Sequence, residues 1–183
     1  MKRQSKSFEI VLSAIACAVA AGALTLGCYV SVMYAAGILL AVFALMVPLS
    51  KNFIWGAALA FLGSALLTFL FYGFSIFKLV PYLLFFGLHP IVNHIQLKYV
   101  KRKWVHIPVM VAKAVWFILS MWLSFELLAV RFFGVDQTTW YDWVMKYFHY
   151  VLWFGGLVLF LAYDILIFLC QKSVDALIRR IRR

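Results

Sequence analysis

Residues 8–47 read FEIVLSAIACAVAAGALTLGCYVSVMYAAGILLAVFALMV, a run of 40 positions with one acidic residue, Glu9, and no lysine or arginine. A helix needs about 20 mostly apolar residues to cross the hydrocarbon core of a bilayer. The run is therefore long enough for two membrane-spanning helices. We expect them at about residues 8–28 and 30–47, joined by a tight turn at Gly27-Cys28-Tyr29.

The rest of the chain has the same character. Of its 183 residues, 67% are hydrophobic and 13% are charged, whereas soluble domains have about 45–50% apolar and about 25% charged residues. A soluble fold of this length has too few polar atoms to cover such a surface. The composition excludes a soluble enzyme, a disordered tail, a disulfide scaffold and a nucleic-acid-binding domain. It predicts an all-α integral membrane protein whose surroundings are the lipid bilayer.

Four further apolar segments follow the first two. The stretch Pro48-Leu49-Ser50-Lys51-Asn52 separates the second span from the third. The sixth span begins between Thr139 and Phe148 and ends near Cys170. We therefore predict six helices in a single membrane domain over residues 1–183, the later four at about 53–72, 79–97, 105–130 and 148–170.

The charges give this division an orientation. With six spans, thirteen of the 17 lysines and arginines fall on the side of the two chain termini. Only Lys78, Arg131 and Lys146 fall on the other side, and Lys113 lies inside the fifth span. Because cytoplasmic loops carry an excess of lysine and arginine, we expect both termini in the cytoplasm of a bacterial cell, with the chain in its cytoplasmic (inner) membrane. The net charge of +11 then reflects orientation and not binding to nucleic acid.

Motifs for common catalytic chemistry are absent from the sequence. There is no Gly-x4-Gly-Lys-Ser/Thr, no His-Glu-x-x-His and no Gly-x-Ser-x-Gly. The six acidic residues form no paired motif, and Cys17, Cys28 and Cys170 lack metal-binding spacing. We therefore predict no enzyme activity, no catalytic residue, no cofactor and no metal site.

A line of polar residues marks the fourth span. His89, Asn93 and Gln96 share one helical face, which Tyr82 and Phe86 extend toward the outside. Pro90 removes a backbone hydrogen bond and predicts a kink near the midplane. Polar groups at this depth avoid lipid, so the line indicates a cavity, a partner contact, a relay or a set of interhelical hydrogen bonds.

The outer side of the chain is rich in aromatic residues. These form either an aromatic belt at the membrane surface or the wall of an outward-facing pocket. Tryptophan and tyrosine suit flat, weakly polar ligands because they offer stacking and one hydrogen bond. The substrate-binding residues that we predict for such a pocket are Tyr82, Phe86, His89, Trp122, Glu126 and Trp153.

Two opposite charges fall inside the last two spans. Lys113 and Asp164 both lie about 9–12 Å from the cytoplasmic edge at a rise of 1.5 Å per residue. A lone charge there costs about 3 kcal/mol or more, so we predict a buried ion pair. It is a structural clamp or takes part in proton or ion coupling; alternatively, Lys113 extends its side chain to the surface without a partner.

Small residues form a stripe along the first span. Ala14, Ala18 and Gly22 repeat every four residues and share one face, and Gly56, Ala60 and Ser64 are similar on the third span. Small stripes let helices pack closely in lipid. The first stripe therefore serves internal packing or the docking of a partner helix.

The topology and the motif Ala14-x-x-x-Ala18, or Ala16-x-x-x-Ala20, resemble an S component, the substrate-capturing subunit of energy-coupling-factor vitamin transporters. The resemblance implies a pocket for a small solute in the outer half. It also implies that the first helices dock on a transmembrane coupling subunit whose ATPases supply energy. The alternative is a membrane scaffold, chaperone or regulatory partner that transports nothing, and a lipid-acting membrane enzyme is a third hypothesis.

Overall fold

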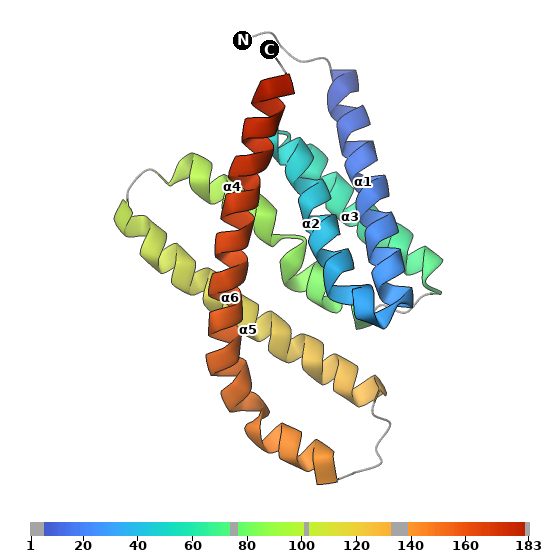
Figure 1. Cartoon of the computed structure of the whole chain (residues 1–183), viewed down its shortest axis with the longest axis vertical. Coiled ribbons are helices and arrows are strands. Elements are labelled where there is room, and N and C mark those ends of the chain that lie inside the picture. The colour runs from blue at the N-terminus through green and yellow to red at the C-terminus, as the bar shows by residue number, and fades with distance from the viewer. Residues whose placement is uncertain (1–5, 74–76, 101–102, 133–138, 182–183) are drawn as a thin grey trace. The chain divides into compact units, whose positions relative to one another are not determined.

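The computed structural model describes residues 6–73, 77–100, 103–132 and 139–181, and these residues form helices without any strand (Figure 1). The prediction of an all-α fold is therefore confirmed for the described part of the chain. The α-helices are α1 (Lys6–Tyr29), α2 (Tyr34–Ser50), α3 (Ile54–Phe71), α4 (His89–Tyr99), α5 (Lys103–Phe132) and α6 (Thr139–Ile181). The short helical segments are η1 (Ser31–Met33), η2 (Phe77–Leu79) and η3 (Tyr82–Phe86).

Within the described residues, five helical segments are long and apolar enough to cross a membrane. They agree with five of the six expected spans and indicate a bilayer environment. Their bounds are Lys6–Tyr29, Ser31–Ser50, Ile54–Phe71, Trp104–Leu127 and Leu152–Val174. The expected fourth span, 79–97, is divided between η3 and α4.

Two helix ends differ from their expected positions. Helix α2 continues through Pro48 to Ser50, so the predicted break begins only at Lys51. A proline in the last turn is tolerated, and here its carbonyl accepts bonds of 3.1 Å from the backbone N–H groups of Lys51 and Phe53. Asn52 then turns the chain with a positive φ of 62°. Helix α6 starts at Thr139, earlier than residue 148 and at the first position of the range expected for the start of the sixth span.

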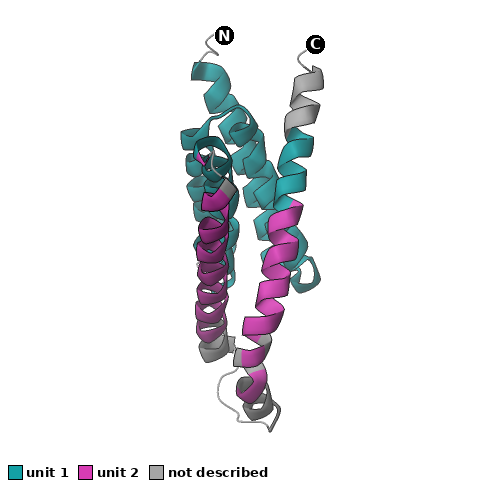
Figure 2. Ribbon diagram, turned by 90° about the vertical axis from the view of Figure 1, so that its left-hand side faces the viewer, with its two compact units in different colours: residues 1–99, 167–183 teal, residues 100–166 magenta. Residues whose placement is uncertain are grey.

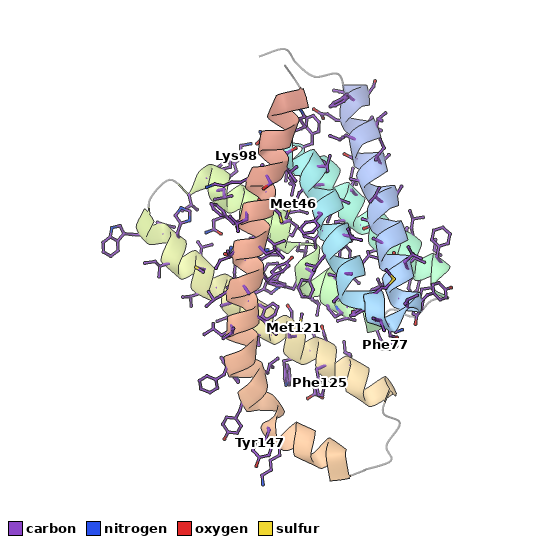
Figure 3. All side chains as sticks on the ribbon, viewed as in Figure 1. Met46, Phe77, Lys98, Met121, Phe125 and Tyr147 are labelled. Carbon is purple, nitrogen blue, oxygen red and sulfur yellow. The ribbon has the colours of Figure 1, made fainter. Side chains whose placement is uncertain are left out.

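The chain forms two compact units, residues 1–99 with 167–183 and residues 100–166 (Figure 2). In the first unit, α1 lies beside both α2 and α3 (Figure 1). Close approach to α2 depends on Gly37, where a Cβ atom would lie 2.5 Å from the carbonyl oxygen of Ala23. Met46 is fully buried in this unit (Figure 3).

Hydrogen bonds join several elements where α1 and α3 end. Lys78 Nζ donates to the carbonyl oxygen of Cys28 at 2.8 Å, and Tyr34 Oη donates to the carbonyl oxygen of Lys78 at 2.5 Å. Tyr29 Oη donates to the carbonyl oxygen of Phe71 at 2.8 Å. A cation at the carbonyl end of α1 also complements the helix dipole. The segment around η2 is therefore anchored to the end of α1 and the start of α2, and Tyr29 separately joins the ends of α1 and α3.

In the second unit, α5 and the part of α6 before residue 167 run antiparallel. Lys113 contacts Asp164, and one turn further along α5 the ring of Phe117 lies 5.8 Å from that of Phe160. A step of four residues toward the C-terminus of α5, from Lys113 to Phe117, is thus matched by a step of four residues toward the N-terminus of α6, from Asp164 to Phe160. Gly156 also faces α5, with Ile118 and Phe117 3.9 Å from a Cβ atom placed there.

Candidate functional site

The most unusual feature of the first unit is the interruption of the fourth span. A π-helical turn, η3 (Tyr82–Phe86), is followed by a turn at Gly87 and Leu88, and α4 begins at His89. The N–H of Gly87 donates to the carbonyl of Tyr82 at 2.9 Å, five residues back, and that of Leu88 to the carbonyl of Phe85 at 3.1 Å. Pro90 has no N–H to offer the carbonyl of Phe86, four residues earlier, and its ring excludes that oxygen. The regular helix therefore fails on the N-terminal side of Pro90.

This break corrects the expected shape of the fourth span. The sequence predicted one kinked helix over 79–97, whereas α4 has only 11 residues and the backbone changes hydrogen-bonding pattern before it. π-Helical turns are rare in proteins as a whole, and those that occur are often found at functional sites. The break is therefore the first candidate for a functional element.

The broken segment follows α3 from one end to the other. Near the end of α3, Lys78 Nζ lies 5.1 Å from the centre of the Tyr72 ring. In the middle, Tyr82 Oη lies 2.9 Å from Ser64 Oγ, and at the turn before α3, His94 Nε2 lies 3.2 Å from Asn52 Oδ1. The segment thus runs antiparallel to α3 over its full length despite the break.

Tight packing surrounds the turn. Tyr82, Phe85 and His89 are fully buried, and the His89 ring lies 4.9 Å from the Phe85 ring. A Cβ atom at Gly87 would overlap the ring of Phe61. Glycine is therefore needed here for close contact with α3, although its backbone angles are ordinary helical ones.

The Tyr82 hydroxyl has a defined role in this packing. Ser64 Oγ donates to the carbonyl oxygen of Phe61 at 2.9 Å. Because a serine hydroxyl has one hydrogen, Tyr82 Oη is the donor in its 2.9 Å bond to Ser64 Oγ. The stripe position Ser64 is thus used inside the protein, together with Ala60, which is also buried.

A chain of polar side chains links α4 to α6. Asn93 Nδ2 donates to Gln171 Oε1 at 3.3 Å, and Gln171 Nε2 lies 2.9 Å from His94 Nδ1. An amide nitrogen only donates, so Nδ1 is the acceptor and the proton of neutral His94 is on Nε2, which donates to Asn52 Oδ1 at 3.2 Å. The hydrogen bonds therefore all run in one direction: Asn93 donates to Gln171, Gln171 donates to His94, and His94 donates to Asn52.

The sequence did not single out Gln171 or Asn52. Gln171 is buried although it lies one position beyond the expected end of the sixth span. A polar residue with a buried position beside Cys170 gives a local signal, but its partner is 78 positions away along the chain. Only the fold brings Asn93 and Gln171 together.

The six predicted substrate-binding residues divide between the units. Tyr82, Phe86 and His89 belong to the first, where Tyr82 and His89 are part of the packed core and the Phe86 ring lies 5.5 Å from the Phe85 ring. Trp122, Glu126 and Trp153 belong to the second, where the two tryptophans are exposed and Glu126 is half-buried. Their joint role in a pocket stays a prediction.

The predicted partners Lys113 and Asp164 lie together in the second unit. Lys113 Nζ is 2.6 Å from Asp164 Oδ1, and the exposed fractions of the two side chains are 4% and 16%. A short charge-assisted bond of this kind offsets much of the cost of burying each charge. The lysine is therefore buried with its counter-ion and does not extend to the surface.

The stripe on α1 is not covered by the neighbouring helices. Ala14, Ala18 and Gly22 are exposed, and a Cβ atom at Gly22 would meet nothing within 4 Å. The neighbouring small residues Ala16 and Ala20 are buried instead. The motif Ala16-x-x-x-Ala20 thus serves internal packing, whereas Ala14, Ala18 and Gly22 leave a narrow surface uncovered.

Comparisons with protein-family models, with curated proteins and with solved structures gave no match for this chain. Among the described residues, no group of three or more histidine, cysteine or acidic side chains is placed to hold a metal ion. The candidate site of the first unit consists of the broken helix and its hydrogen-bonded neighbours, and the ion pair is a separate feature of the second unit.

Proposed function

We propose that this protein is a membrane-embedded substrate-binding subunit of a transport complex. It captures a small, partly aromatic, vitamin-like solute from outside, and a partner ATPase complex drives the rearrangement that releases the solute inward. The single observation that supports this function best is the break in the fourth span between η3 and α4, with buried polar side chains on both sides of it.

The physical argument concerns the cost of irregular backbone in lipid. A non-helical turn at membrane depth is tolerated only where it is buried in protein or lines a cavity. Transporters place their binding sites at such discontinuous helices. Phe85, Gly87 and His89 are buried and Phe86 and Leu88 are half-buried, so most of the break is packed against protein.

The path of the broken segment supports six crossings. Because residues 78–94 follow α3 from end to end, this segment has the length to cross the bilayer although neither of its pieces does so alone. Six crossings place both termini in the cytoplasm and the segment near Lys78 outside. The basic residues then obey the positive-inside rule.

In this proposal the solute replaces contacts that the packed core makes now. Tyr82 and His89 are buried, so capture requires η3 to shift about the Gly87–Leu88 turn. The Tyr82 hydroxyl then exchanges Ser64 for a polar atom of the solute, while Phe86 offers an aromatic face.

Coupling to a partner uses the first helix. The uncovered stripe of Ala14, Ala18 and Gly22 permits a second helix to approach closely. We assign this surface to the transmembrane coupling subunit that carries the ATPases. The ion pair of Lys113 and Asp164 holds α5 and α6 together during the rearrangement.

A scaffold, chaperone or regulator of another membrane complex is the second candidate. The observation that favours it is the hydrogen bonding inside the first unit, where Tyr82, Asn93 and Gln171 all have partners within the chain. A scaffold uses the same α1 stripe for docking and needs no solute.

One experiment distinguishes the two functions. The protein is purified from native membranes in mild detergent, and the proteins and small molecules that accompany it are identified by mass spectrometry. The transport function predicts an ATPase-bearing complex and a thermal shift with one member of a vitamin panel. Tyr82→Phe should weaken that shift, whereas Tyr99→Phe, at an exposed position, should not. A partner without ATPases, and no shift across the panel, would favour the scaffold.

A further inference from the structure

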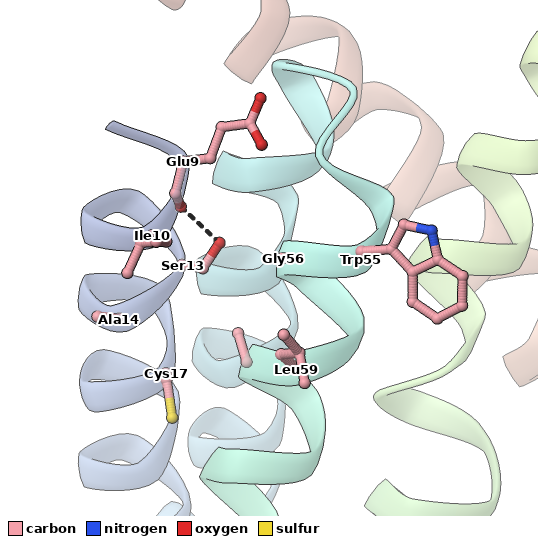
Figure 4. A pocket seen from close by; sticks show the side chains of 9 residues that line it. Glu9, Ile10, Ser13, Ala14, Cys17, Trp55, Gly56 and Leu59 are labelled. Carbon is pink, nitrogen blue, oxygen red and sulfur yellow. Dashed lines mark hydrogen bonds between the residues drawn. The ribbon is translucent and has the colours of Figure 1, made fainter. Parts of the chain in front are cut away.

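A groove lies between α1 and α3 in the first unit, separate from the broken helix (Figure 4). It encloses about 370 Å³. Small residues create it, because Ala14 on one wall and Gly56 and Ala60 on the other leave space beside the contact of the two helices. At Gly56 the helices come so close that a Cβ atom would overlap Ser13 Oγ.

The groove opens toward the surroundings of the first unit. Its rim residues Ile10 and Leu59 are each 68% exposed, and both are apolar. In a bilayer such a groove faces hydrocarbon, so an acyl chain can enter it directly.

One end of the groove is polar. Glu9 stands there beyond Ser13 (Figure 4), and within the part of the chain that the structure describes no cation forms an ion pair with its carboxylate. Ser13 Oγ uses its hydrogen to donate to the carbonyl oxygen of Glu9 at 2.8 Å. The lone pairs of Ser13 Oγ remain able to accept a bond.

Trp55 indicates the depth at which the polar end of the groove lies in the membrane. Trp55 also borders the groove, is 83% exposed and projects from the first turn of α3 (Figure 4). Exposed tryptophans of membrane proteins gather at the level of the lipid headgroups. The carboxylate of Glu9 therefore meets headgroups, while Ala14 and Leu59 meet acyl chains.

We propose that this groove binds a phospholipid with a primary ammonium headgroup, of the phosphatidylethanolamine class. The ammonium donates to the Glu9 carboxylate and to Ser13 Oγ, and an acyl chain lies between α1 and α3. A carboxylate selects a cation and disfavours lipids whose headgroup is only anionic. A quaternary ammonium has no N–H to donate, so phosphatidylcholine binds more weakly.

The test uses the full-length protein purified in mild detergent and exposed to equimolar phosphatidylethanolamine, phosphatidylcholine and phosphatidylglycerol. Native mass spectrometry counts the lipids retained. We expect the wild type to retain phosphatidylethanolamine preferentially. Glu9→Gln should reduce this preference about tenfold, the effect of losing one charge-assisted bond, and Glu9→Asp should keep most of it.

Filling the groove provides the second arm. Ala14→Leu should abolish retention of the lipid, whereas Ala36→Leu, at an exposed position on α2 outside the groove, should leave it unchanged. Circular dichroism checks that each variant is folded. Equal retention of all three lipids by the wild type, or an unchanged preference in Glu9→Gln, would overturn the proposal.

Discussion

Lys113 Nζ and Asp164 Oδ1 lie 2.6 Å apart between α5 and α6 of the second unit. The two residues are 51 positions apart along the chain and occupy the same level because the helices are antiparallel. Phe117 and Phe160 meet one turn away in the same register. A buried ion pair therefore locks the alignment of the two helices.

The ion pair predicts an asymmetry between single and double variants. Asp164→Asn or Lys113→Met alone should lower the free energy of unfolding by about 3 kcal/mol, because each leaves one charge buried without its counter-ion. Replacing both by apolar residues should recover most of that loss. Thermal unfolding of the protein in detergent measures the three variants.

Glu126→Gln provides the control for that experiment. It removes a half-buried acid on α5 that is not part of the pair, and stability should change by less than about 0.5 kcal/mol. If the double variant were as unstable as the singles, the pair would not be the source of the effect.

Gly87→Ala should destabilise the protein by about 1–3 kcal/mol, the usual cost of overpacking. The added methyl group overlaps the Phe61 ring, and Phe61→Leu should restore part of the loss by making room. Gly22→Ala is the matched control, since its methyl group meets nothing within 4 Å. Equal stabilities of the two alanine variants would contradict the packing of the break against α3.

Gln171→Leu should cost about 1–2 kcal/mol because it removes both the acceptor of Asn93 and the donor to His94. Ser173 lies two positions away, is exposed and donates to Leu169 in its own helix, so Ser173→Ala should be nearly neutral. Hydrogen exchange of α4 offers a second measurement, and exchange there should become faster in Gln171→Leu alone. Similar behaviour of the two variants would show that the link between α4 and α6 contributes nothing.

The fourth segment should cross the membrane completely. In a variant without its native cysteines, a cysteine at Lys78 should react with an impermeant thiol reagent from outside, and one at Lys98 only after the membrane is opened. The reason is that the segment follows α3 from end to end. Labelling of both positions from the same side would show that the segment enters and leaves by one face, and the proposed six-span topology would then fail.

Much of the fold follows from local sequence. Apolar runs of span length identify five helices within a few residues, because the transfer of side chains into lipid depends on composition and length alone. Lys113 and Asp164 could be paired from depth in the membrane, since each span advances by a constant rise per residue.

The site follows from the sequence only in part. Pro90 predicted an irregularity in the fourth span. Whether the helix is kinked or completely broken depends on the tertiary structure, in which Gly87 packs against Phe61. The polar face of that span was visible in His89 and Asn93, whereas Gln171 and Asn52 were not, because periodicity describes one helix and says nothing about the residue opposite it.

By itself, then, the sequence determined that this chain belongs in lipid, where its apolar segments begin and end, and which of its residues are too polar to face hydrocarbon. The tertiary structure alone decided which small residues of α1 are buried, with Ala16 and Ala20 inside and Ala14, Ala18 and Gly22 outside. Both sets repeat every four residues, and in a helix that is apolar on all sides only the position of its neighbours distinguishes one face from another.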